Sequence, residues 1–259
     1  MLKYHIFYHY LMVKQKQFYE SVGKRIGWDF SVLNSRIIVK NKKWDFYQEV
    51  AKFLKKNGKL LDIGAGSGEK LFKLPIICNK VIGIDNSKSM INKANENLIN
   101  AKISNVEFKL ADSNKLPFKD EEFDTVSCRH SPFNLREIYR VLKKKGIFIT
   151  QQVGERDKQN IKGIFGRGQS YKKREGSLIN KYSAEARKLG FKIVRKSHYC
   201  ATEYYKYNDL IFLLENTPII PRFNIHKDCK FVRDISKKHN TKYGIKTNSC
   251  RYILVLQKQ

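Results

Sequence analysis

Residues 59–69 read KLLDIGAGSGE, and this stretch decides the fold. A short apolar run is followed directly by glycines at positions 64, 66 and 68, which predicts a buried strand that ends in a tight turn. Glycines at such a turn let the backbone approach a ligand closely and adopt conformations that other residues avoid. The G-x-G-x-G spacing is one residue shorter than the dinucleotide fingerprint, which disfavours a nicotinamide-linked oxidoreductase.

The sequence on both sides of this turn alternates between apolar runs and helical patterns. Further strands are predicted at 80–85, 106–110, 123–127, 146–150, 191–195 and 251–256. Helices are predicted at 44–54, 87–100, 132–142 and 183–189, with an apolar helical piece at 209–214. Strands that alternate with helices in this way form βαβ units around a parallel sheet. We therefore expect an α/β, Rossmann-like doubly wound fold.

Three aspartates stand near the ends of the first three predicted strands. Asp62 lies two positions before the first glycine, Asp85 ends the second strand, and Asp112 follows the third. A carboxylate at Asp85 suits both hydroxyls of a ribose because it only accepts hydrogen bonds. Asp62 suits the cationic amino-acid end of S-adenosylmethionine and would repel a pyrophosphate. With Asp112 placed to meet an adenine amino group, the three predict S-adenosylmethionine as the cofactor.

Four segments together resemble the class I methyltransferases of the methyltransferase type 11 group. They are LLDIGAGSGE (60–69), VIGIDNSKSMI (81–91), LADSNKLPFKDEEFDTV (110–126) and REIYRVLKKKGIFIT (136–150). The resemblance covers roughly residues 58–152; its motifs are specific to the superfamily and not to a substrate. It implies a seven-stranded sheet with the last strand antiparallel, plus a helical insertion between the last two strands. Two positions depart from the family: Lys145 and Arg222 stand where it usually or often has glycine.

The resemblance implies cofactor contacts at Asp62, Gly64, Gly66, Asp85, Asp112 and Ser113. We further expect cofactor contacts from Ala65, Gly68, Asn86, Met90 and Arg129. No metal site is expected, because the cysteines show no ligand spacing.

The chain outside these motifs is expected to serve the methyl acceptor. We divide it into an N-terminal extension and helical cap, 1–43, and a methyltransferase domain, 44–259. Within that domain, 154–181 reads as a long lid loop and 198–247 as a substrate-side insertion. The candidate acceptor contacts are Tyr19, Trp28, His130 and Phe133.

The acceptor and the catalytic residue are not readable from the sequence. Methyl transfer from a sulfonium needs mainly an aligned acceptor and exclusion of water, so a general base is optional. His130 is a weak candidate for one, and Cys128 lacks the neighbouring proline of cytosine-C5 chemistry. We favour a small-molecule acceptor. The alternative is an RNA methyltransferase that gathers Lys162, Arg167, Lys172–Arg174 and Arg222 on one face; a cofactor-binding protein without catalysis has no support in the sequence.

Composition narrows the class of protein but not its partner. The net charge is +28 with 41% hydrophobic residues, which fits a folded basic protein. Lysines are spread along the whole chain, so the charge alone does not require a nucleic-acid partner. The five cysteines are isolated from one another, which predicts unpaired thiols and a cytoplasmic location. No segment reads as a membrane span; Met12 is a possible start, and the oligomeric state is unreadable.

Overall fold

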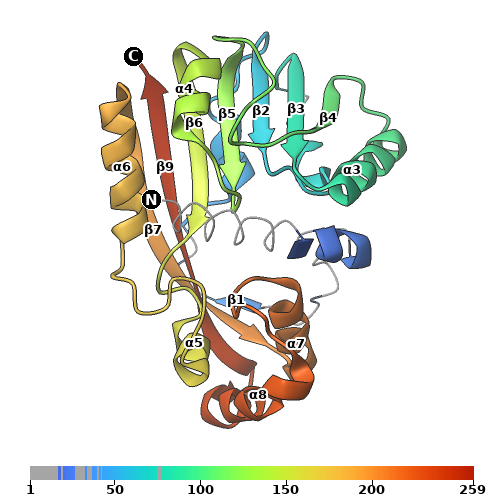
Figure 1. Ribbon diagram of the computed structural model, residues 1–259, viewed down its shortest axis with the longest axis vertical. Coiled ribbons are helices and arrows are strands. Elements are labelled where there is room, and N and C mark those ends of the chain that lie inside the picture. Colours follow the sequence, from blue (N-terminus) through green and yellow to red (C-terminus); the bar gives the residue numbers. More distant parts are fainter. Residues whose placement is uncertain are drawn as a thin grey trace, which may run out of the picture.

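One mixed β-sheet runs through the protein, with its strands in the order β1-β7-β9-β6-β5-β2-β3-β4 (Figure 1). The computed structural model describes residues 17–18, 20–26, 33, 37–39, 41, 43–74 and 77–259. The strands are β1 (Ile37–Val39), β2 (Lys59–Ile63), β3 (Lys80–Asp85), β4 (Val106–Leu110), β5 (Phe123–Arg129), β6 (Leu142–Val153), β7 (Phe191–Tyr205), β8 (Asn240–Thr241) and β9 (Gly244–Lys258).

The strand directions confirm the expected fold class. Strands β4, β3, β2, β5 and β6 pair in parallel, and β9 lies antiparallel between β6 and β7. These seven strands form the predicted sheet, in which the last one runs against the others. Two short strands extend it: β1 pairs with β7 at the edge, and β8 forms a hairpin with β9.

Helices cover both faces of the sheet and also lie beyond the carboxyl ends of its parallel strands (Figure 1). They are α2 (Phe46–Ala51), the 3₁₀ turn η1 (Glu69–Leu71), α3 (Lys88–Ala101), α4 (Leu135–Val141), α5 (Gln159–Phe165), α6 (Ser177–Lys188), α7 (Tyr207–Asn216) and α8 (Ile225–His239). Successive residues of β2 enter different cores: Leu60 packs on the side of α2 and α3, and Leu61 on the side of α4 and α6. The central strands are therefore apolar on both faces, as a parallel sheet between helices requires.

A third core holds α5, α7 and α8 together as a helical lobe. Its buried residues include Phe165, Leu210, Val232 and Ile245. In Figure 1 the parallel strands point with their carboxyl ends toward this lobe. The lobe is attached through β7 and β9, which are paired from Phe191 opposite Lys258 to Tyr205 opposite Ile245. The carboxyl edge of the sheet thus faces the helical lobe.

The second half of the chain is more regular than its sequence indicates. The predicted loop at 154–181 contains α5 and the start of α6, and the short strands predicted at 191–195 and 251–256 are parts of the much longer β7 and β9. The expected insertion at 198–247 begins inside β7 and contains α7, α8 and β8. Charged residues at buried positions, Glu203 in β7 and Lys162 in α5, interrupt the apolar periodicity that would have revealed these elements.

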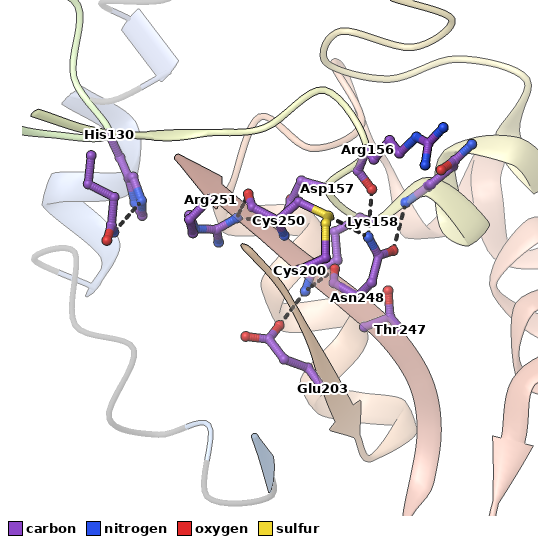
Figure 2. Close-up of polar contacts among 12 residues, drawn as sticks. His130, Arg156, Asp157, Lys158, Cys200, Glu203, Thr247, Asn248, Cys250 and Arg251 are labelled. Atoms are coloured by element: carbon purple, nitrogen blue, oxygen red, sulfur yellow. Dashed lines mark hydrogen bonds and ion pairs between the residues drawn. A yellow bond between two sulfur atoms is a disulfide. The ribbon is translucent and has the colours of Figure 1, made fainter. Parts of the chain in front are cut away.

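The prediction of five unpaired cysteines is wrong for two of them. Cys200 of β7 lies opposite Cys250 of β9, with 4.0 Å between their Cα atoms, and the two form a disulfide (Figure 2). The bond depends on the register of two strands 50 residues apart, which cysteine spacing does not reveal. Cys78, Cys128 and Cys229 are free thiols.

The two departures from the family pattern fall at turns that favour glycine. Lys145 has a φ of 59° and Arg222 a φ of 57°, both in the left-handed region. A non-glycine residue is less stable there because its Cβ approaches the following carbonyl oxygen. The glycines of the family at these positions thus have a conformational explanation.

Candidate cofactor and acceptor site

The glycine turn crosses from the end of β2 to the neighbouring strand β3. The backbone N–H groups of Gly64 and Ala65 both donate to the carbonyl oxygen of Ile84, at 2.8 and 3.0 Å. Gly64, Gly66 and Gly68 have φ values of 77°, 57° and 79°. All three therefore adopt the left-handed conformation that glycine tolerates best.

The three glycines differ in what surrounds them. A Cβ on Gly64 would lie 2.3 Å from the Cβ of Ser131, and one on Gly68 would lie 2.3 Å from the ring of Phe108. A Cβ on Gly66 would meet no heavy atom of the described residues within 4 Å. The outer glycines are thus required by close packing, whereas the backbone at Gly66 borders open space.

Asp85, at the end of β3, is bound to this turn. One carboxylate oxygen accepts the N–H of Gly66 at 3.1 Å, and the other accepts the N–H of Ser87 at 3.0 Å. Burial raises the pKa of Asp85, and the backbone hydrogen bonds from Ser87 and Gly66 counteract that rise. A hydrogen bond thus joins the glycine turn to this carboxylate, and the contact of either with a cofactor stays a prediction.

Asp62 is fully buried, and only one of its two carboxylate oxygens accepts a hydrogen bond from the described residues. Its Oδ1 accepts a short hydrogen bond from the hydroxyl of Ser127 on the adjacent strand β5. Its Oδ2 is buried and has no hydrogen-bond partner among the described residues. Burial raises the pKa of Asp62 to about 7, although the Ser127 hydroxyl and the positive charge of Arg129 oppose this. A buried carboxylate oxygen without a partner is a group that a bound ligand can satisfy.

Arg129, at the end of β5, has a buried donor nitrogen that complements the buried acceptor of Asp62. Its Nε is buried and lacks a partner among the residues that the structure describes. The guanidinium lies over the ring of Tyr47 of α2, 6.0 Å from the centroid. A buried acceptor and a buried donor therefore stand on neighbouring strands at the carboxyl edge of the sheet.

The described helical residues 20–26 pack beside Asp85. Glu20 accepts the hydroxyl of Ser87 at 2.6 Å, and this hydrogen bond is the main reason that the pKa of Glu20 is lowered. A Cβ on Gly23 would lie 2.3 Å from the hydroxyl of Ser89, so this helix touches the start of α3 closely. Arg25 reaches the carbonyl oxygen of Glu215 in α7 at 3.4 Å. The helix thus joins the sheet domain to the helical lobe.

His130 follows β5 directly and is held by Gln151 of β6. The N–H of His130 donates to the Gln151 carbonyl oxygen at 2.9 Å, and the Gln151 side-chain Nε2 lies 3.0 Å from the His130 Nε2. The Gln151 Oε1 accepts the indole N–H of Trp44 at 2.7 Å. His130 has a φ of 57°, and Ser131 after it packs on Gly64. His130 therefore stands next to the glycine turn.

The other predicted cofactor residues lie where the strand ends put them. Asn86 is exposed, whereas Met90 is buried in the first turn of α3. Asp112 is exposed and accepts the N–H of Asn114 at 2.8 Å, and Ser113 is half-buried. Their contact with a cofactor stays a prediction.

Among the predicted acceptor contacts, Phe133 packs inward. Its ring centroid lies 5.1 Å from that of Phe148 and 4.7 Å from that of Tyr182, so at least part of the ring belongs to the core. Tyr19 and Trp28 lie outside the described residues. No sequence pattern marks Ser127, Tyr47 or Gln151 as functional; for Ser127 the only trace is a hydroxyl in an apolar strand.

An ionic cluster lies between β9, β7 and the start of α5, set apart from His130 in Figure 2. The ammonium of Lys158 forms a buried ion pair with Glu203, which also accepts the hydroxyl of Tyr205 at 2.7 Å. Arg251 pairs with Asp157 in the same region. These contacts connect the helical lobe to the sheet through charge rather than apolar packing alone.

Two of the basic residues expected on a nucleic-acid face are used inside the protein. Lys162 is buried at 2% exposure, and burial lowers its pKa. Arg167 makes two hydrogen bonds to the carboxylate of Asp228, at 3.1 and 3.0 Å. Lys172–Arg174 and Arg222 are exposed. The segment that carries Lys162 and Arg167 thus helps to hold the lobe together.

Among the described residues, no helix is long and apolar enough to cross a membrane.

Comparison with known proteins identifies the family. The sequence profile of the methyltransferase domain matches residues 54–199, which is more than half of the chain. The uncharacterized methyltransferase YcgJ of Bacillus subtilis is 33% identical over 98 residues, 35% of this chain and 39% of that protein. The chain therefore spans about two fifths of this relative's length.

Two further likenesses cover more of the chain. A demethylmenaquinone methyltransferase of Lactococcus lactis is 27% identical over 217 residues, 73% of this chain and 84% of that protein. The crystal structure of a methyltransferase-like protein from Bacillus halodurans superposes with a TM-score of 0.62 at 18% identity, over 83% of this chain and 98% of that one, and so shares the fold. The glycine turn, the sheet order and the matched profile agree: the chain belongs to the methyltransferase domain family, a family of enzymes, and has the class I methyltransferase fold.

Proposed function

We propose that the protein is an S-adenosylmethionine-dependent methyltransferase that acts on a small-molecule acceptor. The main support for this cofactor is a pair of buried polar atoms without hydrogen-bond partners among the described residues, Asp62 Oδ2 and Arg129 Nε. Both are buried, and a buried polar atom without a partner costs about 1–3 kcal/mol, more when it is charged. A ligand that satisfies both would recover this free energy on binding.

The methionine end of S-adenosylmethionine has the matching chemistry. Its ammonium group donates hydrogen bonds and its carboxylate accepts them, so Asp62 would hold the first and Arg129 the second. Asp85 would receive the ribose hydroxyls beside the open backbone at Gly66. Asp112, Ser113, Asn86 and Met90 would surround the adenine. The cofactor supplies an electrophilic methyl group; the protein binds and orients it.

The acceptor would bind between the carboxyl edge of the sheet and the helical lobe. We propose that helical residues 20–26 cap the cofactor, because Glu20 lies beside Ser87 and Arg25 reaches α7. The demethylmenaquinone methyltransferase among the relatives supports a small molecule as acceptor. The internal use of Lys162 and Arg167 leaves RNA without support. A cytoplasmic location stays a prediction, and the Cys200–Cys250 disulfide removes part of its basis.

Calorimetric titration tests the cofactor directly. The wild-type protein is expected to bind S-adenosylhomocysteine, the demethylated product, and Asp85→Ala is expected to bind it at least tenfold more weakly. Asp120→Ala is the matched control, because Asp120 is an exposed carboxylate that pairs with Arg140. Binding of NAD in place of S-adenosylhomocysteine would contradict the proposal and require a dinucleotide site at the glycine turn.

A further inference from the structure

The contacts of Gln151 determine which way its amide group points. An indole N–H can only donate, so the Gln151 atom 2.7 Å from Trp44 Nε1 must be the carbonyl oxygen. The NH₂ group then faces His130 Nε2 at 3.0 Å. The reverse orientation would place an NH₂ group against the buried N–H of Trp44, which is 5% exposed. The indole N–H of Trp44 therefore sets the orientation of the Gln151 amide, which in turn faces His130.

The orientation of the amide fixes the protonation of the imidazole. An NH₂ group can only donate, so the Nε2 of His130 must accept with its lone pair. A neutral ring then carries its proton on Nδ1. In an imidazolium, the Nε2–H of His130 would face the NH₂ group of Gln151, and both are donors. Protonation at Nε2 therefore requires this hydrogen bond to break. The Nε2 lone pair is therefore occupied before any substrate arrives.

Gln151 also holds the backbone of His130. Its carbonyl oxygen accepts the His130 N–H at 2.9 Å, and His130 adopts a left-handed conformation with a φ of 57°. Trp44 in turn contacts Tyr199 of β7 edge to face, with 4.5 Å between ring centroids. The imidazole is thus fixed in position and in tautomer by Gln151 of β6, supported by Trp44 just before α2 and Tyr199 of β7.

We propose that Gln151 is a positioning residue that keeps His130 as a hydrogen-bond donor through Nδ1–H, and so excludes its Nε2 as the general base. The inference rests on the proposed function, in which the cofactor binds at the glycine turn next to His130. In the transfer, the sulfur–methyl bond breaks with its electrons on sulfur and a lone pair of the acceptor forms the new bond. His130 neither gains nor loses a proton in this step, so any proton that the acceptor loses leaves by another route.

Nuclear magnetic resonance of the ¹⁵N-histidine-labelled protein reads the tautomer without any acceptor. The signals of His130 are assigned by their loss in His130→Gln. In the wild type, at a pH where the ring is neutral, we expect an unprotonated Nε2 and a protonated Nδ1. Gln151→Glu replaces the donor by a carboxylate acceptor, so the ring proton is expected on Nε2. Gln48→Glu, an exposed position on α2, adds the same charge and is expected to leave the tautomer unchanged.

A wild-type ring protonated on Nε2 would overturn the proposal, as would a tautomer that stays the same in Gln151→Glu. Trp44→Phe provides a second variant in case Gln151→Glu fails to fold. It frees the amide to rotate, and a mixture of the two tautomers is expected. Titration of the same samples with S-adenosylhomocysteine separates the two levels: a wild type that does not bind it contradicts the proposed function, while the tautomer still decides the role of Gln151.

Discussion

In the proposed function, the buried carboxyl of Asp62 makes cofactor binding depend on pH. Its pKa of about 7 exceeds the ordinary value of about 3.9, a difference worth about 4 kcal/mol at 1.36 kcal/mol per pH unit. An ammonium group at Oδ2 would stabilise the ionised form and return the pKa toward its ordinary range. The ligand therefore binds the ionised protein, and protons compete with it below pH 7.

The expected effect follows from the fraction of Asp62 that is ionised. With a pKa of about 7, affinity for S-adenosylhomocysteine should fall about 25-fold between pH 7.5 and pH 5.5. Calorimetry in buffers of different ionisation enthalpy should detect the release of roughly half a proton at pH 7 and about 0.9 at pH 6. Asp62→Asn should bind weakly with no such slope, whereas Asp112→Asn, at an exposed aspartate, should keep the slope.

Without ligand, the raised pKa of Asp62 should be visible in how the stability of the protein depends on pH. The folded pKa of Asp62 lies above the unfolded one, so the folded state binds the extra proton and stability falls as pH rises from about 4 to about 7. Asp62→Asn should remove this part of the decline in urea denaturation. Equal affinity at pH 5.5 and 7.5, without proton release, would refute the assignment of an ammonium-binding role to Asp62.

Three further predictions concern the helical lobe and the turns. Reduction of the Cys200–Cys250 disulfide should lower the free energy of unfolding by about 2–4 kcal/mol in urea titrations; equal oxidised and reduced curves would show that the bond adds nothing. Glu203→Gln should cost about 3–5 kcal/mol by leaving the Lys158 ammonium buried and unpaired, and adding Lys158→Met should restore most of the loss in the same assay. Lys145→Gly should raise stability by about 0.5–1 kcal/mol because it relieves a left-handed backbone, and a lower melting temperature would contradict this.

The sheet domain could be predicted because each of its features is local in the sequence. The apolar run of β2, the glycine turn and Asp85 lie within 27 residues, and their roles follow from strand ends and backbone conformation. Even the departures at Lys145 and Arg222 marked turns that the structure places in the left-handed region. Sequence-based reasoning works where one motif carries both the fold and the chemistry.

The helical insertion was expected, but the contacts that hold the helical lobe and the acceptor side could not be predicted because they depend on registers between distant strands. The pairing of Gln151 with Trp44 and His130 requires β6, the end of β5 and the segment just before α2 to be aligned, and no spacing encodes that alignment. The same holds for Lys158, whose partner Glu203 lies 45 residues away on β7. A basic stretch that is predicted to be a loop can thus contain residues that hold a core together.

The unsatisfied atoms of the site separate function from stability. Ser127 hydrogen-bonds one oxygen of Asp62, so the carboxylate is held in place, yet the other oxygen is left without a partner in the described part of the chain. An apolar residue at this position would fill a strand buried on both faces at no such cost. In the proposed function, the carboxylate therefore destabilises the protein without ligand, and a ligand with a positively charged donor group supplies the missing hydrogen bond. A stabilising effect of Asp62→Leu without ligand, combined with loss of S-adenosylhomocysteine binding, is the pattern that this trade between stability and binding requires.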